Sequence, residues 1–268
     1  MNKSICVVIG CLLMTGCLTP NLTIKDHRAS FLFDNAGTRV MNILAHNISD
    51  SQFEGTLNRC IGNGDKLVYL FTAYNKGDGP GTTSFYIDDK FNGTIDNNKV
   101  KLMQKRMKKI KDKKLSIVAW MFADDNTRNV NFKDTAALKN CLKTAINKFD
   151  SYISEYVVAL EADEYLSSGQ VEELAAYIKK ETGKPVGSHQ VPGKYNYSAN
   201  KSIDKHYHQY GFNKSNSYIE KQTKLIKAAL NKPVVAAEYD MSSDSAGAKS
   251  RGDAAMKGGA SGTGNGRN

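Results

Sequence analysis

The sequence is poor in cysteine, and this scarcity excludes several ways of building a protein. The chain has 268 residues and five cysteines, and only Cys60 and Cys141 follow Cys17. Two thiols so far apart do not make a disulfide framework, and neither has the spacing of a metal-ligand pair. Both lie in amphipathic helical patterns. We therefore expect buried, reduced side chains at both positions, no bound metal and no cofactor.

Long hydrophobic runs are missing beyond the N-terminus, so the sequence predicts no membrane-spanning helix after residue 17. The glycine-rich loop 75–81 does not open directly into a helix, so it is not a phosphate-binding loop. Repeats on the scale of a domain are absent. A content of 40% hydrophobic residues is enough for a core. The length suits one domain near the usual size of a (β/α)8 barrel, about 250 residues.

Acidic residues are in short supply, since 37 lysines and arginines face 27 aspartates and glutamates and give a net charge of +10. Much of the excess lies in the segment 99–114, whose apolar residues keep a helical stripe. One interpretation is a binding patch for acidic glycans, phospholipid headgroups or nucleic acid. The other is the solvated outer face of a barrel helix. We expect no nucleic acid partner, because the N-terminus indicates export.

The first seventeen residues have the layout of a secretory signal. Lys3 supplies a basic start, the apolar stretch 5–14 follows, and Thr15 and Gly16 are small residues before Cys17. The ending Leu-Met-Thr-Gly-Cys resembles a bacterial lipobox. This resemblance implies that Cys17 becomes the lipidated first residue of the mature protein, anchored to the cell envelope.

Two alternatives to this anchor stay open. Cys11 ends a rival box, which would leave a very short apolar region, and an ordinary cleaved signal would make the protein secreted. Leu18 after the cysteine favours the outer membrane if the cell is Gram-negative. We expect a linker over 18–28 and a barrel domain over 29–268.

Short apolar runs alternate with helical patterns along the rest of the chain. The expected strands are 30–34, 66–74, 115–122, 156–161, 185–190, 203–212, 233–238 and one in the C-terminal tail. The expected helices are 50–60, 99–114, 134–149, 169–181, 215–230 and 249–257. This alternation predicts an α/β fold with a parallel sheet and right-handed crossovers. We predict a single-domain (β/α)8 TIM barrel that lacks the eighth helix, although the tail 258–268 could instead be a disordered linker.

Glutamates stand at the ends of two of these apolar runs. Tyr-Val-Val-Ala-Leu-Glu-Ala-Asp-Glu-Tyr places Glu161 and Glu164 after one strand, and Lys-Pro-Val-Val-Ala-Ala-Glu places Glu238 after another. The carboxyl ends of the strands form the active-site face of a barrel. Two carboxyl groups facing each other there can cleave a glycosidic bond, one as acid and one as nucleophile or base. A buried acid should gain proton affinity by desolvation, while its partner stays ionised beside hydrogen-bond donors.

These strings resemble the glycoside hydrolases of the large (β/α)8 superfamily called clan A. The resemblance implies that the glutamate ending strand four is the acid/base and the one ending strand seven is the nucleophile. Asp163-Glu164 is similar to the family's Asn-Glu pair, and Glu238 matches the nucleophile position. It therefore implies hydrolysis of a β-linked glycan by a retaining mechanism, with Glu164 as acid/base, Glu238 as nucleophile and Glu161 as the rival acid.

Several departures from the clan pattern argue for a diverged or inactive member. The aromatic residue usual on strand eight is replaced by Gly-Thr-Gly-Asn-Gly, and no clear arginine stands on strand one. The strings 157–165, 206–212 and 252–266 also resemble a family of hydrolases without an assigned activity, found in bacteria and phages. A catalytically inactive carbohydrate-binding or interaction lipoprotein on the same barrel is therefore the alternative.

Further candidates for sugar binding lie near the predicted strand ends. Histidine can hydrogen-bond sugar hydroxyls and tune a neighbouring carboxylate. A metal interpretation would need several ligands to converge, for instance His206, His208 and Glu238. Aspartates or aromatic rings near the mouth can contact a sugar, although capping turns and core packing explain them equally simply. The candidate substrate-binding residues are His189, His206, His208, Tyr210, Tyr239, Asp124, Asp125 and Asn75.

Overall fold

The structure is a computed structural model that describes most of the chain. The described residues are 28–30, 44, 48–62, 64–75, 83–85, 94–122, 132–211, 214–239 and 245–265. The predicted signal segment with Cys17 lies outside these ranges, and so do Asp124 and Asp125.

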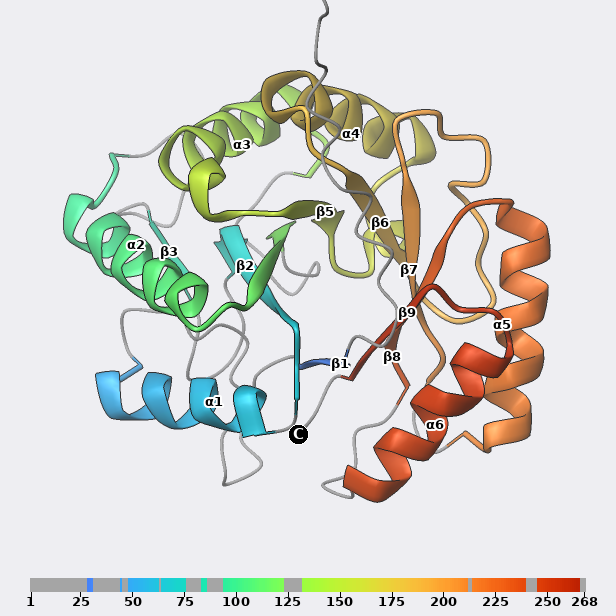
Figure 1. Ribbon diagram of the computed structural model, residues 1–268. Coiled ribbons are helices and arrows are strands. Elements are labelled where there is room, and N and C mark those ends of the chain that lie inside the picture. The colour runs from blue at the N-terminus through green and yellow to red at the C-terminus, as the bar shows by residue number, and fades with distance from the viewer. Residues whose placement is uncertain are drawn as a thin grey trace, which may run out of the picture.

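Eight parallel strands close into a barrel, as Figure 1 shows together with the helices around it. The ring follows the order β1-β9-β8-β7-β6-β5-β4-β2, and β1 pairs with β2 to close it. The ninth strand, β3, is short and pairs antiparallel with the end of β2. The strands are β1 Arg28–Ser30, β2 Leu67–Asn75, β3 Thr83–Ser84, β4 Ser116–Phe122, β5 Glu155–Ala159, β6 Val186–Gln190, β7 Lys205–Gln209, β8 Val234–Glu238 and β9 Gly262–Asn265.

Six helices return the chain between consecutive parallel strands. They are α1 Asp50–Gly62, α2 Asn97–Asp112, α3 Thr135–Phe149, α4 Ser168–Thr182, α5 Asn216–Leu230 and α6 Ser245–Lys257. Short 3₁₀ turns stand at Asp150–Tyr152 and Ala162–Glu164. The predicted barrel is thus confirmed, and the described residues contain no helix after β9. The connection 191–204 between β6 and β7 is also without a helix.

The predicted elements all occur, and three of their boundaries differ clearly from the prediction. The strand predicted over 203–212 is Lys205–Gln209, and the helix predicted over 249–257 begins at Ser245. The first strand was predicted over 30–34, whereas β1 is Arg28–Ser30, and residues 31–34 lie outside the described ranges.

Local signals explain the other boundaries. Ser49 caps α1, because its Oγ accepts the Gln52 amide hydrogen while its own amide donates to the Gln52 side chain. Gly183, at φ +67°, ends α4 in the left-handed conformation that glycine adopts most easily.

The inside of the barrel is packed with side chains. Trp120 is fully buried there and tilts against the ring of Tyr69, with the centroids 5.5 Å apart. A Cβ on Gly264 would lie 2.5 Å from the ring of Tyr69, and one on Gly187 would lie 2.6 Å from the ring of Tyr207. The glycine-rich tail therefore has a structural reason, because β9 must leave room for an aromatic ring of β2.

We call the end where the parallel strands begin the base, and the end where they finish the mouth. Glu155 opens β5 at the base and accepts hydrogen bonds from Lys205 Nζ and from the Tyr207 hydroxyl, each at 2.6 Å. Burial raises the pKa of Glu155, and Lys205 opposes that shift. This buried ion pair joins β5 to β7 beneath the aromatic core.

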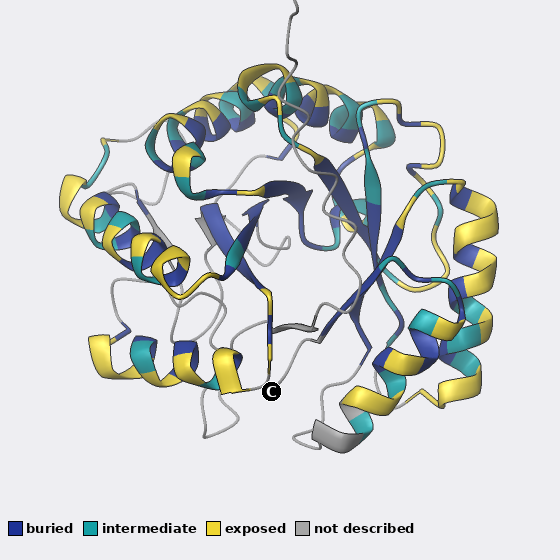
Figure 2. Ribbon diagram, in the orientation of Figure 1, coloured by how far each residue is buried: buried dark blue, intermediate teal, exposed yellow. Residues whose placement is uncertain are grey.

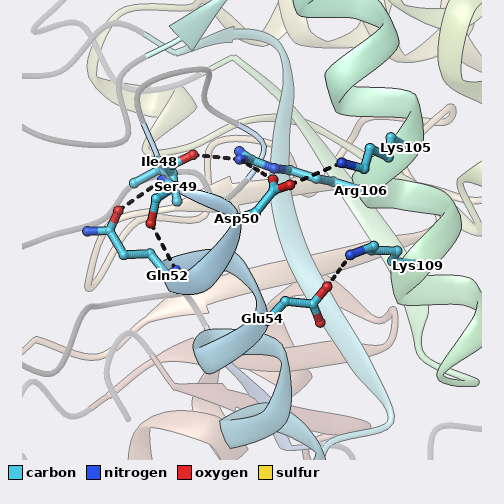
Figure 3. A network of polar contacts seen from close by, with 8 residues as sticks. All are labelled: Ile48, Ser49, Asp50, Gln52, Glu54, Lys105, Arg106 and Lys109. Atoms are coloured by element: carbon cyan, nitrogen blue, oxygen red, sulfur yellow. Dashed lines mark hydrogen bonds and ion pairs between the residues drawn. The ribbon is translucent and has the colours of Figure 1, made fainter.

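The helices form an outer layer whose solvent-facing residues are exposed and whose sheet-facing residues are buried (Figure 2). Cys60 and Cys141 are buried and free, as predicted. Polar contacts join α1 to α2 (Figure 3): the buried Arg106 donates to the Ile48 carbonyl and Asp50, and Lys109 pairs with Glu54. The segment 99–114 is thus an outer helix. None of the described helices is both long and apolar enough to cross a bilayer.

Candidate active site

Two carboxylates from β5 and β8 meet at one amide nitrogen at the mouth of the barrel. Nε2 of Gln209, the last residue of β7, donates to Glu161 Oε1 at 2.9 Å and to Glu238 Oε2 at 3.3 Å. The two oxygens therefore lie no farther apart than the sum of these distances, 6.2 Å. The structure thus places Glu161 with Glu238, and it adds Gln209, a residue that we did not predict.

An irregularity between β7 and β8 brings Glu238 to this position. The pairing runs His208 with Ala236 and then Gln209 with Glu238, so Ala237 is skipped. Such a bulge changes the direction of a side chain and is common near active sites. Here the bulge pairs Gln209 with Glu238, whose side chains meet. Ala237 faces the barrel core, and without the bulge the next residue, Glu238, would face the other side of the sheet.

Glu161 follows the end of β5 in a strained conformation. Its backbone has φ +45° and ψ +39°, the left-handed region, which is uncommon for residues other than glycine. Strain of this kind persists only where surrounding contacts hold it, and it is concentrated at functional sites. Two contacts hold this residue: Gln209 binds the carboxylate, and the backbone N–H donates to His189 Nδ1 at 2.8 Å.

His189, at the end of β6, stands between the two glutamates. Because its Nδ1 accepts the Glu161 amide hydrogen, the proton of the neutral ring lies on Nε2. Nε2 faces Glu238 Oε2 at 3.5 Å, longer than an ordinary hydrogen bond. Burial, together with the nearby His208, holds the pKa of His189 well below 6.5, so the ring is neutral. Trp120 supports the ring with a centroid distance of 4.9 Å.

Glu164, the other predicted acid, is exposed on the 3₁₀ turn Ala162–Glu164. Its amide donates to the Glu161 carbonyl at 3.0 Å, as in a tight turn. Asp163, just before it, is directed toward the backbone, and its Oδ1 accepts the Val191 amide hydrogen at 3.0 Å. The structure therefore gives Asp163 a role in fixing the loop after β6 and does not join Glu164 to the carboxylate pair.

His206 and His208 lie on the other face of β7 from the site. Side chains alternate along a strand, and Tyr207 and Gln209 point into the barrel. His206 and His208 are both fully buried behind the sheet. Ser188 Oγ lies 3.0 Å from His206 Nδ1, and Gln190 Nε2 lies 3.5 Å from both imidazoles. The predicted sugar-binding role does not fit this placement.

These two histidines make a prediction about stability. Burial lowers the pKa of His206 to about 4 and that of His208 to about 3, against 6.5 for the free side chain. The unfolded chain therefore binds more protons below pH 6.5, and the free energy of unfolding falls as the pH drops from 6.5 toward 4. The His206 shift alone is worth roughly 3 kcal/mol.

Urea denaturation between pH 7.5 and 4.5 measures this loss, and a variant carrying His206→Gln and His208→Gln should show a shallower pH dependence. The raised pKa values of the buried Glu155 and Asp163 act in the opposite direction. The folded protein binds protons at these two groups more tightly than the unfolded chain does, so they raise the free energy of unfolding as the pH falls. The two proteins share those groups, so the difference between them isolates the histidines. Parallel pH profiles would contradict the prediction.

The remaining predicted side chains do not contact the carboxylate pair or are not among the described atoms, although the Tyr210 amide donates to the Glu238 carbonyl at 2.7 Å. Tyr210 and Tyr239 are buried in the cluster that packs β8 against α5 and α6, and the Tyr210 hydroxyl accepts from Thr223 at 2.9 Å. Asn75 ends β2, but its side chain is not among the described atoms. No group of three potential metal ligands occurs in the described part of the chain.

The fold is a (β/α)8 barrel with a pair of carboxylates at its mouth. Solved structures of similar fold include glycoside hydrolases. A glycoside hydrolase family 5 structure from Bacteroides vulgatus aligns with a TM-score of 0.64 and 11% identity, over 90% of this chain and 57% of that one. This chain therefore spans little more than half of that protein.

Two further structures match over most of both chains. A GH113 β-1,4-mannanase aligns with a TM-score of 0.58 and 14% identity, over 90% of this chain and 87% of that one. The cellulose synthase subunit Z of Clostridioides difficile aligns with a TM-score of 0.63 and 12% identity, over 90% and 92%. At such identities the likeness establishes the fold alone. No protein-family profile and no curated sequence matches the chain.

Proposed function

We propose that this protein hydrolyses a β-linked glycan by a retaining mechanism, with Glu238 as nucleophile and Glu161 as acid/base. The observation that carries the proposal is the shared contact with Gln209, which limits the two carboxylate oxygens to a separation of 6.2 Å. Retaining enzymes have carboxyl groups about 5–5.5 Å apart, and inverting enzymes need about 6.5–9.5 Å to admit a water. The short separation supports retention.

The roles follow from the contacts of each carboxylate. Glu238 is buried and has two nitrogens, from Gln209 and His189, facing one oxygen, so an ionised nucleophile has donors beside it. Glu161 is less buried and sits on the turn, where a leaving group can reach it. In the first step the Glu161 proton passes to the glycosidic oxygen as Glu238 attacks the anomeric carbon. In the second step Glu161 removes a proton from water while the water oxygen attacks the anomeric carbon. The bond from this carbon to Glu238 breaks, and Glu238 leaves as a carboxylate.

Gln209 and His189 are positioning residues in this proposal. Gln209 donates to both carboxylates from one nitrogen. Neutral His189 accepts from the Glu161 backbone at Nδ1 and faces the Glu238 carboxylate with Nε2. Apo-state contacts of this kind are often long and shorten when substrate binds. The sugar and the linkage are open, and the β-1,4-mannanase neighbour makes β-linked polysaccharides the first substrates to test.

The test is a panel of β-linked polysaccharides and activated aryl β-glycosides, assayed with the full chain and with Glu238→Gln. Product release by the wild type alone supports the hydrolase. The alternative is a carbohydrate-binding protein, which is favoured by the glycine that β9 carries where the clan resemblance expects an aromatic residue. Binding of a glycan without product above the Glu238→Gln background would establish that alternative.

We also propose that Cys17 is the lipidated residue that anchors the protein to the cell envelope, on the strength of the Leu-Met-Thr-Gly-Cys ending. Wild-type protein expressed in a bacterium should then incorporate radioactive palmitate and fractionate with membranes. Cys17→Ser should lose the label, whereas Cys11→Ser, the matched control at the rival box, should keep it. Equal labelling of wild type and Cys17→Ser would contradict the anchor.

A further inference from the structure

The base of the barrel carries a concentration of positive charge that the proposed chemistry does not use. Each parallel strand runs toward the mouth, so each connecting helix runs back and ends at the base. All six helices have a lysine or arginine in their last turn. Lys111, Lys180, Lys227 and Lys257 are the exposed members of this set, although Lys257 is close to Glu220 in the second turn of α5.

The loops that lead into the strands add further lysines to the base. Lys66 precedes β2, and Lys113 and Lys114 precede β4, and all three side chains are exposed. Within the described residues none of these seven lysines forms an ion pair with an acid. Three acids at this end pair with other lysines: Asp150 with Lys184, Asp204 with Lys179 and Asp112 with Lys108. Glu181 at the end of α4 is exposed and forms no ion pair in the part of the chain that the structure describes.

The mouth carries charges of both signs. Its described residues include four carboxylates, Glu161, Asp163, Glu164 and Glu238, and the exposed Lys194 and Lys214, and Lys194 pairs with Asp163 at 3.9 Å. A concentration of lysines at one end orients the molecule at an anionic surface, because that end is attracted to it.

The direction of β1 shows which end lies toward the N-terminus. Because β1 pairs parallel with β2 and β9, Arg28 is at the base, and the preceding chain joins the barrel there. Ten residues separate Arg28 from Cys17, and an extended segment of that length reaches at most about 35 Å. An anchor at Cys17 would thus hold the base, rather than the mouth, close to the bilayer.

We propose that the base of the barrel docks on anionic phospholipid headgroups, so that the carboxylate pair faces away from the membrane. The charge distribution is independent of the proposed hydrolysis, and the tether argument rests on the proposed Cys17 anchor. Basic residues add to membrane affinity only within about a Debye length of the surface, roughly 8 Å at physiological salt. Lysines that end neighbouring helices and precede neighbouring strands at one end of a barrel can meet that condition together.

Lysine acetylation mapped by mass spectrometry tests the orientation on the full chain. Vesicles of phosphatidylglycerol and phosphatidylcholine should protect Lys66, Lys113, Lys180 and Lys227, and vesicles of phosphatidylcholine alone should not. Four exposed lysines away from the base are the internal control: Lys101, Lys143, Lys221 and Lys249. They should stay reactive with both kinds of vesicle. Equal protection of the base lysines and the control lysines, or protection that does not depend on phosphatidylglycerol, would overturn the proposal.

Flotation of two matched variants gives a second readout. Changing the four base lysines to glutamine should reduce binding to the anionic vesicles at least tenfold, since each lysine near the surface contributes about fivefold. Changing the four control lysines to glutamine removes the same charge and should cost less than about twofold. The chain before the barrel is the same in every sample, so its contribution to binding cancels in the comparison. An equal loss in both variants, or protection by double-stranded DNA and not by the vesicles, would refute membrane docking.

Discussion

Glu238→Gln is expected to reduce turnover of any glycan substrate by about 10⁴-fold or more, because an amide cannot form the covalent glycosyl intermediate. Glutamine has nearly the shape of glutamate, and its amide oxygen can still accept from Gln209. Binding should therefore stay within about threefold of the wild type. Initial rates on the best polysaccharide, together with calorimetric titration of an oligosaccharide, measure the two effects separately.

The matched control is Glu155→Gln, which changes the buried glutamate at the base of the same barrel. Glu155 binds Lys205 and Tyr207 far from the mouth, so this variant should lose stability and keep catalysis when it is folded. A Glu238→Gln protein that is folded and fully active would remove Glu238 from the mechanism.

Glu161→Gln is expected to slow substrates with poor leaving groups by about 10²–10⁴-fold, the usual contribution of general acid catalysis. Activated aryl glycosides need little protonation of the leaving group, so their first step should be affected less. Their second step still lacks a base, and added azide should restore it in part. The ratio of the losses for the two kinds of substrate measures the acid role.

Glu164→Gln is the control for that experiment, because Glu164 is an exposed carboxylate three residues away on the same turn. It should leave both kinds of substrate within about twofold of the wild type. If instead Glu164→Gln shows the leaving-group dependence and the azide rescue, the acid is Glu164 and the apo geometry at Gln209 is not the catalytic one.

The barrel could be predicted from the sequence because each of its strands and helices has a local signal. Buried strands such as 116–122 are short apolar runs, and helices such as α4 have a serine cap and a glycine end. The closing strand β9 was the difficult one, since Gly-Thr-Gly-Asn has no strand propensity. Gly264 makes sense only with the ring of Tyr69 in place, which is a contact between distant segments.

The site was predictable only in part. Glu161 and Glu238 stood at strand ends, but the sequence does not say which alternate side chains of β7 face inward. We therefore chose His206 and His208, and the structure turns Gln209 inward instead. The choice between Glu161 and Glu164 depends on a left-handed residue after β5, and a glutamate gives no signal of that conformation. Gln209 had no signal in the sequence beyond a polar side chain within the predicted strand 203–212.

The stereochemistry of the first product tests the carboxylate pair most directly. Proton NMR of the reaction, followed from the first minutes on a β-linked substrate that the wild type cleaves, distinguishes the anomer released by the enzyme from the one formed later by mutarotation. With Glu161 Oε1 and Glu238 Oε2 no more than 6.2 Å apart, the account predicts that the β-anomer appears first. Initial release of the α-anomer would mean an inverting reaction and would contradict the retaining pair.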